Sequence, residues 1–152
     1  KEMIKAAKTF KGLPHRLEFI TSINRVDFYN DSKSTNAVST KTAVNSLLEK
    51  YSQLVLILGG IAKQENYSEL IELINEKVET VVLIGDSSKV FSEQLSVPTL
   101  KIARSMEEAV GLSKSLTKNG AVVLSPACAS FDMFDDFNDR GDQFKHHVNE
   151  GS

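Results

Sequence analysis

The chain has 152 residues, a length that fits one domain with a hydrophobic core of useful size. Hydrophobic residues make up 41% of it and charged residues 25%, which is ordinary for a soluble globular protein. A formal net charge of −2 excludes the strongly basic surface typical of proteins that bind nucleic acid or anionic membranes. No apolar run approaches the roughly 20 residues that a membrane helix needs, and no signal peptide is recognisable.

The cysteine content indicates the cellular compartment of the chain, and the first residue indicates whether the chain is a fragment. The single cysteine, Cys128, excludes an internal disulfide and is compatible with a reducing cytoplasm. Because the chain begins at Lys1 rather than Met, we expect a fragment or a processed product. We therefore predict a soluble cytoplasmic polypeptide that forms a single domain over residues 1–152.

Hydrophobic periodicity predicts strands that alternate with helices along the whole chain. Apolar runs predict strands over 17–23, 26–29, 54–58, 80–84, 98–102 and 121–124. Apolar stripes at helical spacing predict helices over 3–10, 36–50, 66–78, 87–95 and 105–116, and a last helix from residue 131. Asn24-Arg25 separates the first two strands by two residues, which predicts a β-hairpin. Asn66 with Glu69, and Ser105 with Glu108, have the spacing of capping boxes.

This alternation predicts an α/β fold with three αβα layers. The sheet should be mostly parallel, with one antiparallel edge strand supplied by the hairpin. The carboxyl ends of parallel strands share one rim, which here would carry residues 31–35, 59–63, 85–88 and 125–130. Polar turns that converge on such a rim predict a binding crevice.

The octapeptide Tyr29-Asn30-Asp31-Ser32-Lys33-Ser34-Thr35-Asn36 is the most unusual of these turns. A carboxylate, an ammonium group and three hydroxyl groups between a strand and a helix indicate a polar, charged ligand. The alternative is an ordinary helix start with Thr35 or Asn36 as the cap, and the spacing does not decide between the two.

The turns at 59–63 and 124–132 carry weaker signals. Gly59-Gly60-Ile61-Ala62-Lys63 lacks the spacing of a phosphate loop, so it predicts only close backbone approach and an ammonium group at the rim, or a solvated lysine. Small residues from Ser125 to Ser130 leave room and N–H groups for a carboxylate or phosphate. Cys128 has no recognisable base, which argues against a catalytic cysteine.

The last part of the chain is rich in phenylalanine and aspartate. Phe131, Phe134, Phe137 and Phe144 recur at helical intervals, and core packing explains most of them. Four aspartates in the same stretch would complement the positive end of that helix: Asp132, Asp135, Asp136 and Asp139. His146-His147 is interpreted as the helix end, and the cysteine and histidines lack metal-site spacing, so no metal site is expected.

Four separated motifs, in this order, carry a resemblance to a known family. They are Gly12-Leu13-Pro14-His15-Arg16-Leu17-Glu18, the octapeptide 29–36, Leu124-Ser125-Pro126-Ala127-Cys128-Ala129-Ser130, and Phe137 with Arg140-Gly141. Over residues 12–152 the chain resembles the C-terminal domain of the Mur ligases, and the resemblance implies a Rossmann-like fold. It also implies that the UDP-binding N-terminal domain and the central ATPase domain lie outside this chain.

The resemblance implies an ATP-dependent amide-bond ligase of peptidoglycan synthesis, and hence of cell-wall growth and division. ATP would phosphorylate the carboxylate of UDP-N-acetylmuramoyl-L-alanine, and D-glutamate would attack the acyl phosphate. The family motif implies Arg16, Asp31 and Lys33 as nucleotide-binding residues. It implies a D-glutamate pocket of five residues: Thr35, Lys63, Ser130, Phe131 and Phe137.

The resemblance also limits what this chain does alone. The phosphate loop and the Mg²⁺ ligands belong to the central domain, so the fragment by itself is predicted to be inactive, with no self-sufficient catalytic residue. Two alternatives stay open, namely another Mur-type or folylpolyglutamate-type ligase, and a stand-alone α/β ligand-binding module.

Overall fold

The structure is a computed structural model that describes residues 13–150. The helix expected over residues 3–10 lies outside this range. The strands are β1 (Glu18–Ile23), β2 (Val26–Asn30), β3 (Leu54–Gly59), β4 (Thr80–Ile84), β5 (Thr99–Ile102) and β6 (Gly120–Leu124). The helices are α2 (Ala37–Leu48), α3 (Ser68–Lys77), α4 (Ser88–Gln94), α5 (Met106–Leu116) and α6 (Phe137–Asn149).

The strands form one six-stranded sheet in the order β1-β2-β6-β3-β4-β5. Every neighbouring pair is parallel except β1 and β2, which form the antiparallel hairpin at one edge. Asn24 and Arg25 have φ angles of 51° and 70°, the left-handed conformation that a two-residue hairpin turn requires. The predicted mostly parallel sheet with one antiparallel edge strand is confirmed.

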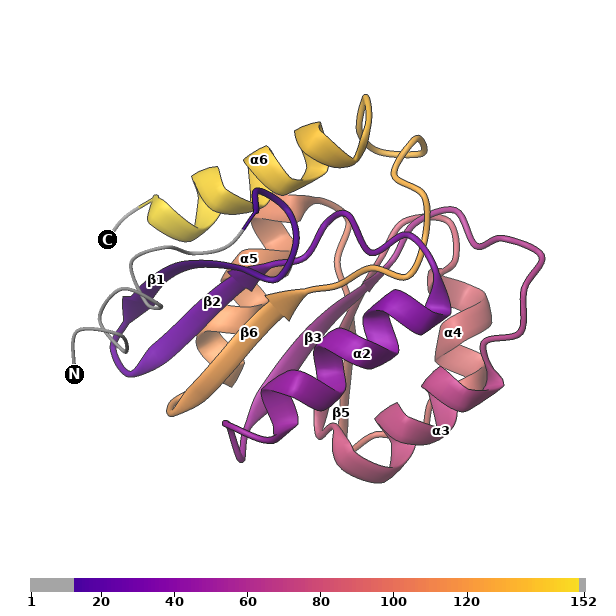
Figure 1. The fold of residues 1–152 in the computed structure, drawn as a ribbon, viewed down its shortest axis with the longest axis horizontal. Helices are drawn as coiled ribbons and strands as arrows, with labels where there is room; N and C mark the ends of the chain where they lie inside the picture. Colours follow the sequence, from indigo (N-terminus) through magenta and orange to yellow (C-terminus); the bar gives the residue numbers. More distant parts are fainter. Residues whose placement is uncertain (1–12, 151–152) are drawn as a thin grey trace.

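Helices cover both faces of this sheet, which gives the three expected layers (Figure 1). Side chains from α2, α3 and α4 pack on one face, against one set of alternating strand residues. Side chains from α5 and α6 pack on the other face, against the second set. The central strands β3, β4 and β6 therefore have almost no exposed residue, which explains their continuous apolar sequences.

Most helix starts agree with the sequence, and two differ. Asn36 and Ser105 cap α2 and α5 as expected. The expected cap at Asn66 is wrong, because α3 has Tyr67 as its N-cap, while the Asn66 Oδ1 atom accepts a hydrogen bond from the Ser68 N–H at 2.8 Å. Within residues 13–150, every helix is too short or too polar to span a membrane.

The last helix begins at Phe137, six residues later than expected. The carbonyl of Ser130 accepts hydrogen bonds from the N–H groups of Met133 and Phe134, so this segment closes into turns instead of a helix. Asp136 then caps α6 by accepting a bond from Asp139 N–H at 2.8 Å. Phe131 is consequently 69% exposed and does not pack in the core.

Candidate functional site

The turns that follow β2, β3, β4 and β6 meet at the carboxyl rim of the sheet. The N–H of Asp31 donates to the carbonyl of Leu124 at 2.7 Å, which joins the turns after β2 and β6. Ile61 and Ala129 exchange two backbone hydrogen bonds, of 2.9 and 3.1 Å, which join the turns after β3 and β6. The rim expected from the sequence is thus a single hydrogen-bonded surface.

Gly60 lies where three of these turns touch. Its N–H donates to Ser87 Oγ at 3.1 Å, and its carbonyl accepts from the Ser87 N–H at 2.9 Å. Its φ angle is 142°, and a Cβ atom there would lie 2.3 Å from the carbonyl oxygen of Ala129. The close backbone approach expected at this glycine is made by the protein itself.

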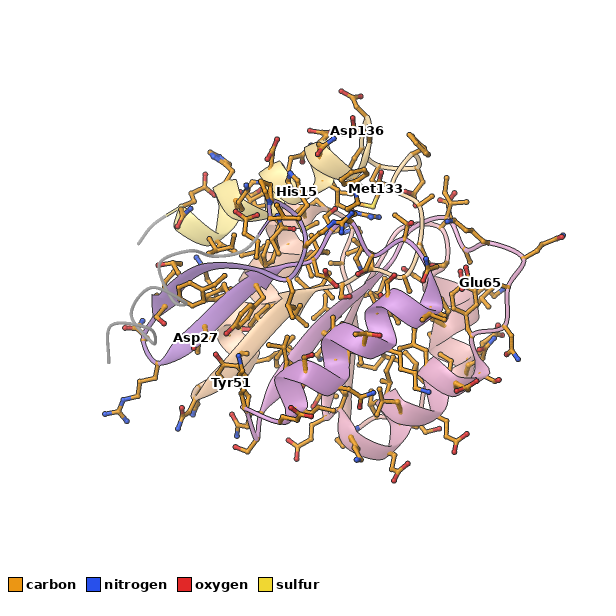
Figure 2. The ribbon with its side chains drawn as sticks, viewed as in Figure 1. His15, Asp27, Tyr51, Glu65, Met133 and Asp136 are labelled. Carbon is orange, nitrogen blue, oxygen red and sulfur yellow. The ribbon has the colours of Figure 1, made fainter. Side chains whose placement is uncertain are left out.

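His15 anchors the segment that carries Arg16 beside α6 (Figure 2). The ring is buried, and its Nδ1 atom lies 2.8 Å from the Asn30 Nδ2 atom, which can donate to it. Gly141 lets the ring reach this place, because a Cβ atom on that residue would lie 2.1 Å from His15 Nδ1. Burial, and the nearby positive charge of Lys145, lower the pKa of His15 below its usual 6.5, so the ring is neutral near pH 7.

Asp31 is buried and joins the segment before β1 to the turn after β2. Its Oδ1 atom accepts from the N–H of Leu17 at 2.9 Å. Its Oδ2 atom accepts from Ser34 Oγ at 2.5 Å and from Ser125 Oγ at 2.7 Å. Burial raises the pKa of Asp31, and these three hydrogen bonds act against that rise. Both carboxylate oxygens accept hydrogen bonds from the protein. Asp31 therefore holds the turn after β2 in position and is not free to contact a ligand.

Arg16, Asp31 and Lys33 line one groove, which we call the rim groove. Its volume is about 540 Å³, and its floor continues along α2 through Val38, Ser39, Thr42, Ala43 and Ser46. The Arg16 side chain is exposed and has no hydrogen-bonding or ionic partner among residues 13–150. The groove therefore joins two available cationic groups to hydroxyl groups and small apolar surfaces, which suits a phosphorylated ligand.

Phe137 links Lys33 to the other group of predicted residues. The Lys33 Nζ atom lies 5.2 Å from the centre of the Phe137 ring, within the range of a cation–π contact. The same ring meets the His15 ring edge to face, with centroids 6.0 Å apart. One predicted nucleotide-binding residue, Lys33, therefore contacts one predicted D-glutamate-binding residue, Phe137, at the start of α6.

Thr35, Lys63 and Ser130 lie on the three turns that meet at the rim. The side chains of Lys63 and Ser130 make no hydrogen bond to any residue from 13 to 150. Tyr67 ties Lys63 to the turn after β6, since its hydroxyl accepts from the Lys63 N–H at 3.0 Å and donates to the Ala127 carbonyl at 3.4 Å. The Lys63 ammonium group is thus exposed to a polar ligand, whereas Ser130 is only 2% exposed, so its unpaired hydroxyl lies beneath the surface.

The backbone after Ala129 adds donors to the same place. The N–H groups of Ser130 and Phe131 donate to no residue in the described range, whereas those of Ala127 and Ala129 bond within the rim. Free backbone N–H groups favour a bound carboxylate. The exposed Phe131 ring contributes little to this polar group, so its predicted role rests on its backbone.

Arg140 is the site residue to which the sequence assigned no role. Its guanidinium is fully buried and donates to Ser32 Oγ, to the Ser32 carbonyl and to the Cys128 carbonyl, at 2.8, 2.6 and 2.9 Å. Burial lowers its pKa to about 10, so it stays charged near pH 7. Arg140 shares the buried side of α6 with Phe144 and Val148, and this spacing was the available signal.

Two further residues of the rim serve the structure. Cys128 is buried, and burial raises the pKa of its thiol to about 11, so the thiol stays protonated near pH 7. Asp132 lies before α6, not in it as expected. Its Oδ2 atom accepts from the Asp86 N–H at 2.9 Å, so it ties the turn after β4 to the rim.

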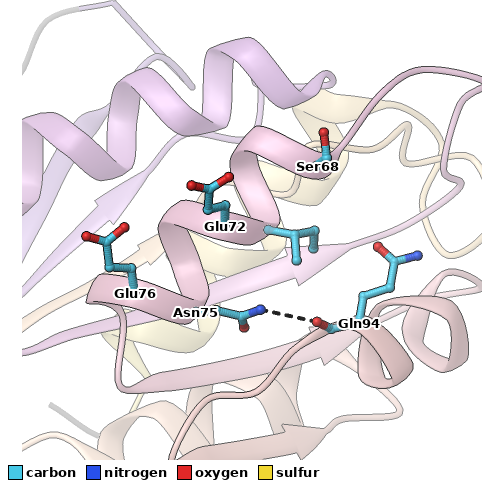
Figure 3. Close-up of a pocket in the computed structure, with 6 residues that line it drawn as sticks. Ser68, Glu72, Asn75, Glu76 and Gln94 are labelled. Atoms are coloured by element: carbon cyan, nitrogen blue, oxygen red, sulfur yellow. Dashed lines mark hydrogen bonds between the residues drawn. The ribbon is translucent and has the colours of Figure 1, made fainter.

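A second concavity lies between α3 and α4, outside the rim (Figure 3). Its volume is about 610 Å³, and its lining includes Glu72, Glu76 and an Asn75–Gln94 hydrogen bond of 3.2 Å. It contains none of the predicted site residues and no cationic side chain. The rim groove is therefore the better candidate for an anionic ligand.

Comparison with known families decides the assignment. Residues 15–128, well over half of the chain, match the family described as Mur ligase, glutamate ligase domain. The chain belongs to this family. The matched range contains His15, Arg16 and the turns after β2 and β3, while the Ser130–Phe137 segment and α6 follow it.

Curated relatives of this Mur ligase domain extend the match to almost the whole chain. The UDP-N-acetylmuramoylalanine–D-glutamate ligase of Cytophaga hutchinsonii is 47% identical over 95% of this chain and 32% of its own length. The enzyme of the same name from Marinobacter nauticus is 42% identical over 94% of this chain and 32% of its own length. The chain thus spans about a third of these relatives.

Solved structures support the fold. A MurF ligase from Thermotoga maritima in complex with ADP has a TM-score of 0.62, 18% identity, and coverage of 93% of this chain and 33% of that one. A folylpolyglutamate synthase from Mycobacterium tuberculosis, complexed with ADP and AMPPCP, has a TM-score of 0.64 and 14% identity, with coverage of 87% and 32%. The α/β fold of this Mur ligase domain is therefore shared with both enzymes.

Proposed function

We propose that this chain is the C-terminal domain of a UDP-N-acetylmuramoylalanine–D-glutamate ligase, and that it binds D-glutamate and closes over the nucleotide. The observation that carries the proposal is the 41–47% identity to ligases of that name over nearly the whole chain. Identity to the MurF and folylpolyglutamate enzymes is only 18% and 14%, which favours D-glutamate over the amino acids of related ligases.

In the proposed reaction, ATP transfers its γ-phosphate to the carboxylate of UDP-N-acetylmuramoyl-L-alanine and leaves as ADP. The amine of D-glutamate then attacks the acyl carbon of this mixed anhydride, and phosphate departs as the amide bond forms. Arg16 and Lys33, with exposed cationic groups in the rim groove, would contact the nucleotide. Asp31 would hold both of their segments in place, because it bonds to Leu17 beside Arg16, to Ser34 beside Lys33, and to Ser125.

For D-glutamate, the proposed pocket combines charge and backbone donors. Lys63 would pair with one carboxylate of the amino acid, and the hydroxyl groups of Thr35 and Ser130 would complete its hydrogen bonds. The free N–H group of Phe131 would donate to the same substrate. Phe137 would form the wall between this pocket and Lys33.

We propose that the whole chain forms one domain and that catalysis requires the parts of the longer enzyme outside it. Mg²⁺, which would neutralise phosphate charge, fits oxygen ligands. The one carboxylate of the groove, Asp31, has both oxygens bonded to the protein, so the ion would be held elsewhere in the enzyme. A cytoplasmic location follows from the proposed use of ATP.

The experiment is an NMR titration of the 15N-labelled chain with D-glutamate, and with L-glutamate as control. We expect weak, stereoselective shifts centred on Thr35, Lys63, Ser130 and Phe137. Lys63→Ala should abolish them, whereas Lys50→Ala, at an exposed lysine just past the far end of α2, should not. Equal shifts for both enantiomers, or shifts away from the rim, would contradict the residue assignments. No shift with either enantiomer would remove the claim of a preformed pocket.

A further inference from the structure

Three potential metal ligands lie together at the carboxyl end of α6, outside the rim. They are His146, His147 and Glu150, and each offers one ligand atom within 4.8 Å of the other two. The His146 Nε2 atom lies 3.6 Å from Glu150 Oε2, and the His147 Nδ1 atom lies 3.3 Å from Glu150 Oε1. Among residues 13–150, no other group of three such side chains converges in this way.

The helix itself produces this arrangement. His146 and Glu150 are four residues apart and so lie on the same face, while His147 is three residues before Glu150 and flanks it. The N–H of Glu150 donates to the carbonyl of His146 at 3.0 Å, so the backbone of the third ligand is still held by the last turn. The two imidazole rings meet edge to face, with centroids 5.0 Å apart.

Lys114 fixes the same turn from the neighbouring helix. Its Nζ atom, carried by α5, donates to the carbonyls of His147, Val148 and Glu150 at 3.4, 2.9 and 3.4 Å. The backbone of two of the three ligands is therefore held in place before any ion binds. The Lys114 charge lies nearby and opposes a second cation, so we expect a weaker site than a buried one with the same ligands.

The chemistry of the donors selects the ion. Two imidazole nitrogens and one carboxylate oxygen suit Zn²⁺ and its first-row neighbours, whereas Mg²⁺ and Ca²⁺ prefer oxygen ligands alone. Ligands of a tetrahedral Zn²⁺ ion lie about 3.3 Å apart, given bonds of roughly 2.0–2.1 Å. Each histidine nitrogen is already close to this distance from one of the two Glu150 oxygens: His146 Nε2 lies 3.6 Å from Oε2, and His147 Nδ1 lies 3.3 Å from Oε1.

We infer that His146, His147 and Glu150 form a surface site for a divalent transition-metal ion such as Zn²⁺, with water in the remaining position. An ion there would also meet the negative end of the helix dipole. The inference is independent of the proposed ligase function, because none of these residues lies in the rim groove. It differs from the expectations from the sequence, which interpreted the two histidines as a helix end and predicted no metal site.

The test is isothermal titration of the purified chain with ZnCl₂, followed by Co²⁺ binding monitored by visible absorption. We expect one saturable Zn²⁺ site, visible Co²⁺ bands, and no displacement by excess Mg²⁺. His146→Ala, His147→Ala and Glu150→Gln should each weaken Zn²⁺ binding at least about tenfold, since each removes one ligand. Glu76→Gln, which removes an exposed carboxylate from α3, is the matched control and should bind as the parent chain does.

Circular dichroism of each variant checks that α6 is retained. Since all three side chains are at least partly exposed, we expect each variant to fold. Absence of saturable Zn²⁺ binding by the parent chain would overturn the inference. So would Zn²⁺ binding that persists when both histidines are replaced, because the ion would then use other ligands.

Discussion

At the residue scale, the site depends on ionisable side chains that are buried and bonded to the protein. Asp31 uses both carboxylate oxygens to hold Leu17, Ser34 and Ser125, and His15 is buried against Gly141. The polar atoms of both residues are bonded to the protein, so neither residue is placed to contact a ligand directly. Their effect is to hold Arg16 and Lys33, whose cationic groups remain exposed, at one end of the groove.

His15 gives a prediction about pH. Its pKa is lowered by burial and by Lys145, while Asp142, Glu18 and the hydrogen bond from Asn30 act in the opposite direction. The unfolded chain therefore binds a proton more readily, and the contribution of His15 to stability is lost as pH falls from about 6.5 through the folded-state value. The His15 ring signals in an NMR pH titration should give a pKa below 6.5; a value at or above 6.5 would refute this account.

A matched variant separates His15 from the other groups that titrate in the same range. Asparagine tolerates the left-handed φ of 64° found at this position, so His15→Asn should keep the local backbone. Between pH 7 and pH 5, urea unfolding should show a smaller loss of stability for this variant than for the parent chain. Equal losses in both proteins would assign the acid sensitivity to other residues.

At the element scale, α6 is joined to the sheet by one buried side chain. Arg140 connects the turn after β2, through Ser32, with the turn after β6, through Cys128. No carboxylate lies within ion-pair distance of its guanidinium among residues 13–150, so its three hydrogen bonds must offset the desolvation of the charge. Loss of Arg140 should therefore loosen both turns at once.

Arg140→Met keeps most of the side-chain volume and leaves the carbonyls of Ser32 and Cys128 without their donor. We expect a loss of roughly 2–4 kcal/mol in the free energy of unfolding, from unsatisfied buried groups. The matched control is Arg104→Met, because Arg104 is exposed and its one ionic partner among residues 13–150 is Glu108; its effect should stay within about 0.5 kcal/mol. Urea denaturation measures both, and equal effects would show that Arg140 does not hold the turns.

The elements also show how far the sequence alone can lead. The buried strands were predictable because apolar runs such as Leu54–Leu58 must be covered on both faces, and Thr80–Ile84 was predicted with its observed bounds. The start of α6 was not predictable in this way, because a helical spacing of phenylalanines cannot reveal that the Ser130 carbonyl closes a turn. The role of Arg140 was not predicted for a related reason, because the burial of a charged side chain depends on hydrogen-bond partners that only the tertiary structure reveals.

At the scale of the whole molecule, the sheet brings distant segments of the chain to one rim. Arg16, Lys33 and Phe137 come from three separate parts of the sequence and lie together there. The rim carries exposed ammonium and guanidinium groups and free N–H donors, but the described residues offer no phosphate loop. This agrees with the proposed function, in which the domain would complete a site by closing on the rest of a longer ligase.

The most direct measurement is an amide-ligation assay on the complete polypeptide of which this chain is the proposed C-terminal domain. Phosphate release should require ATP, UDP-N-acetylmuramoyl-L-alanine and D-glutamate together, and L-glutamate should not replace the D-enantiomer. The 152-residue chain alone should release none. Full activity with a different amino acid, or phosphate release that does not depend on any amino acid, would contradict the assignment.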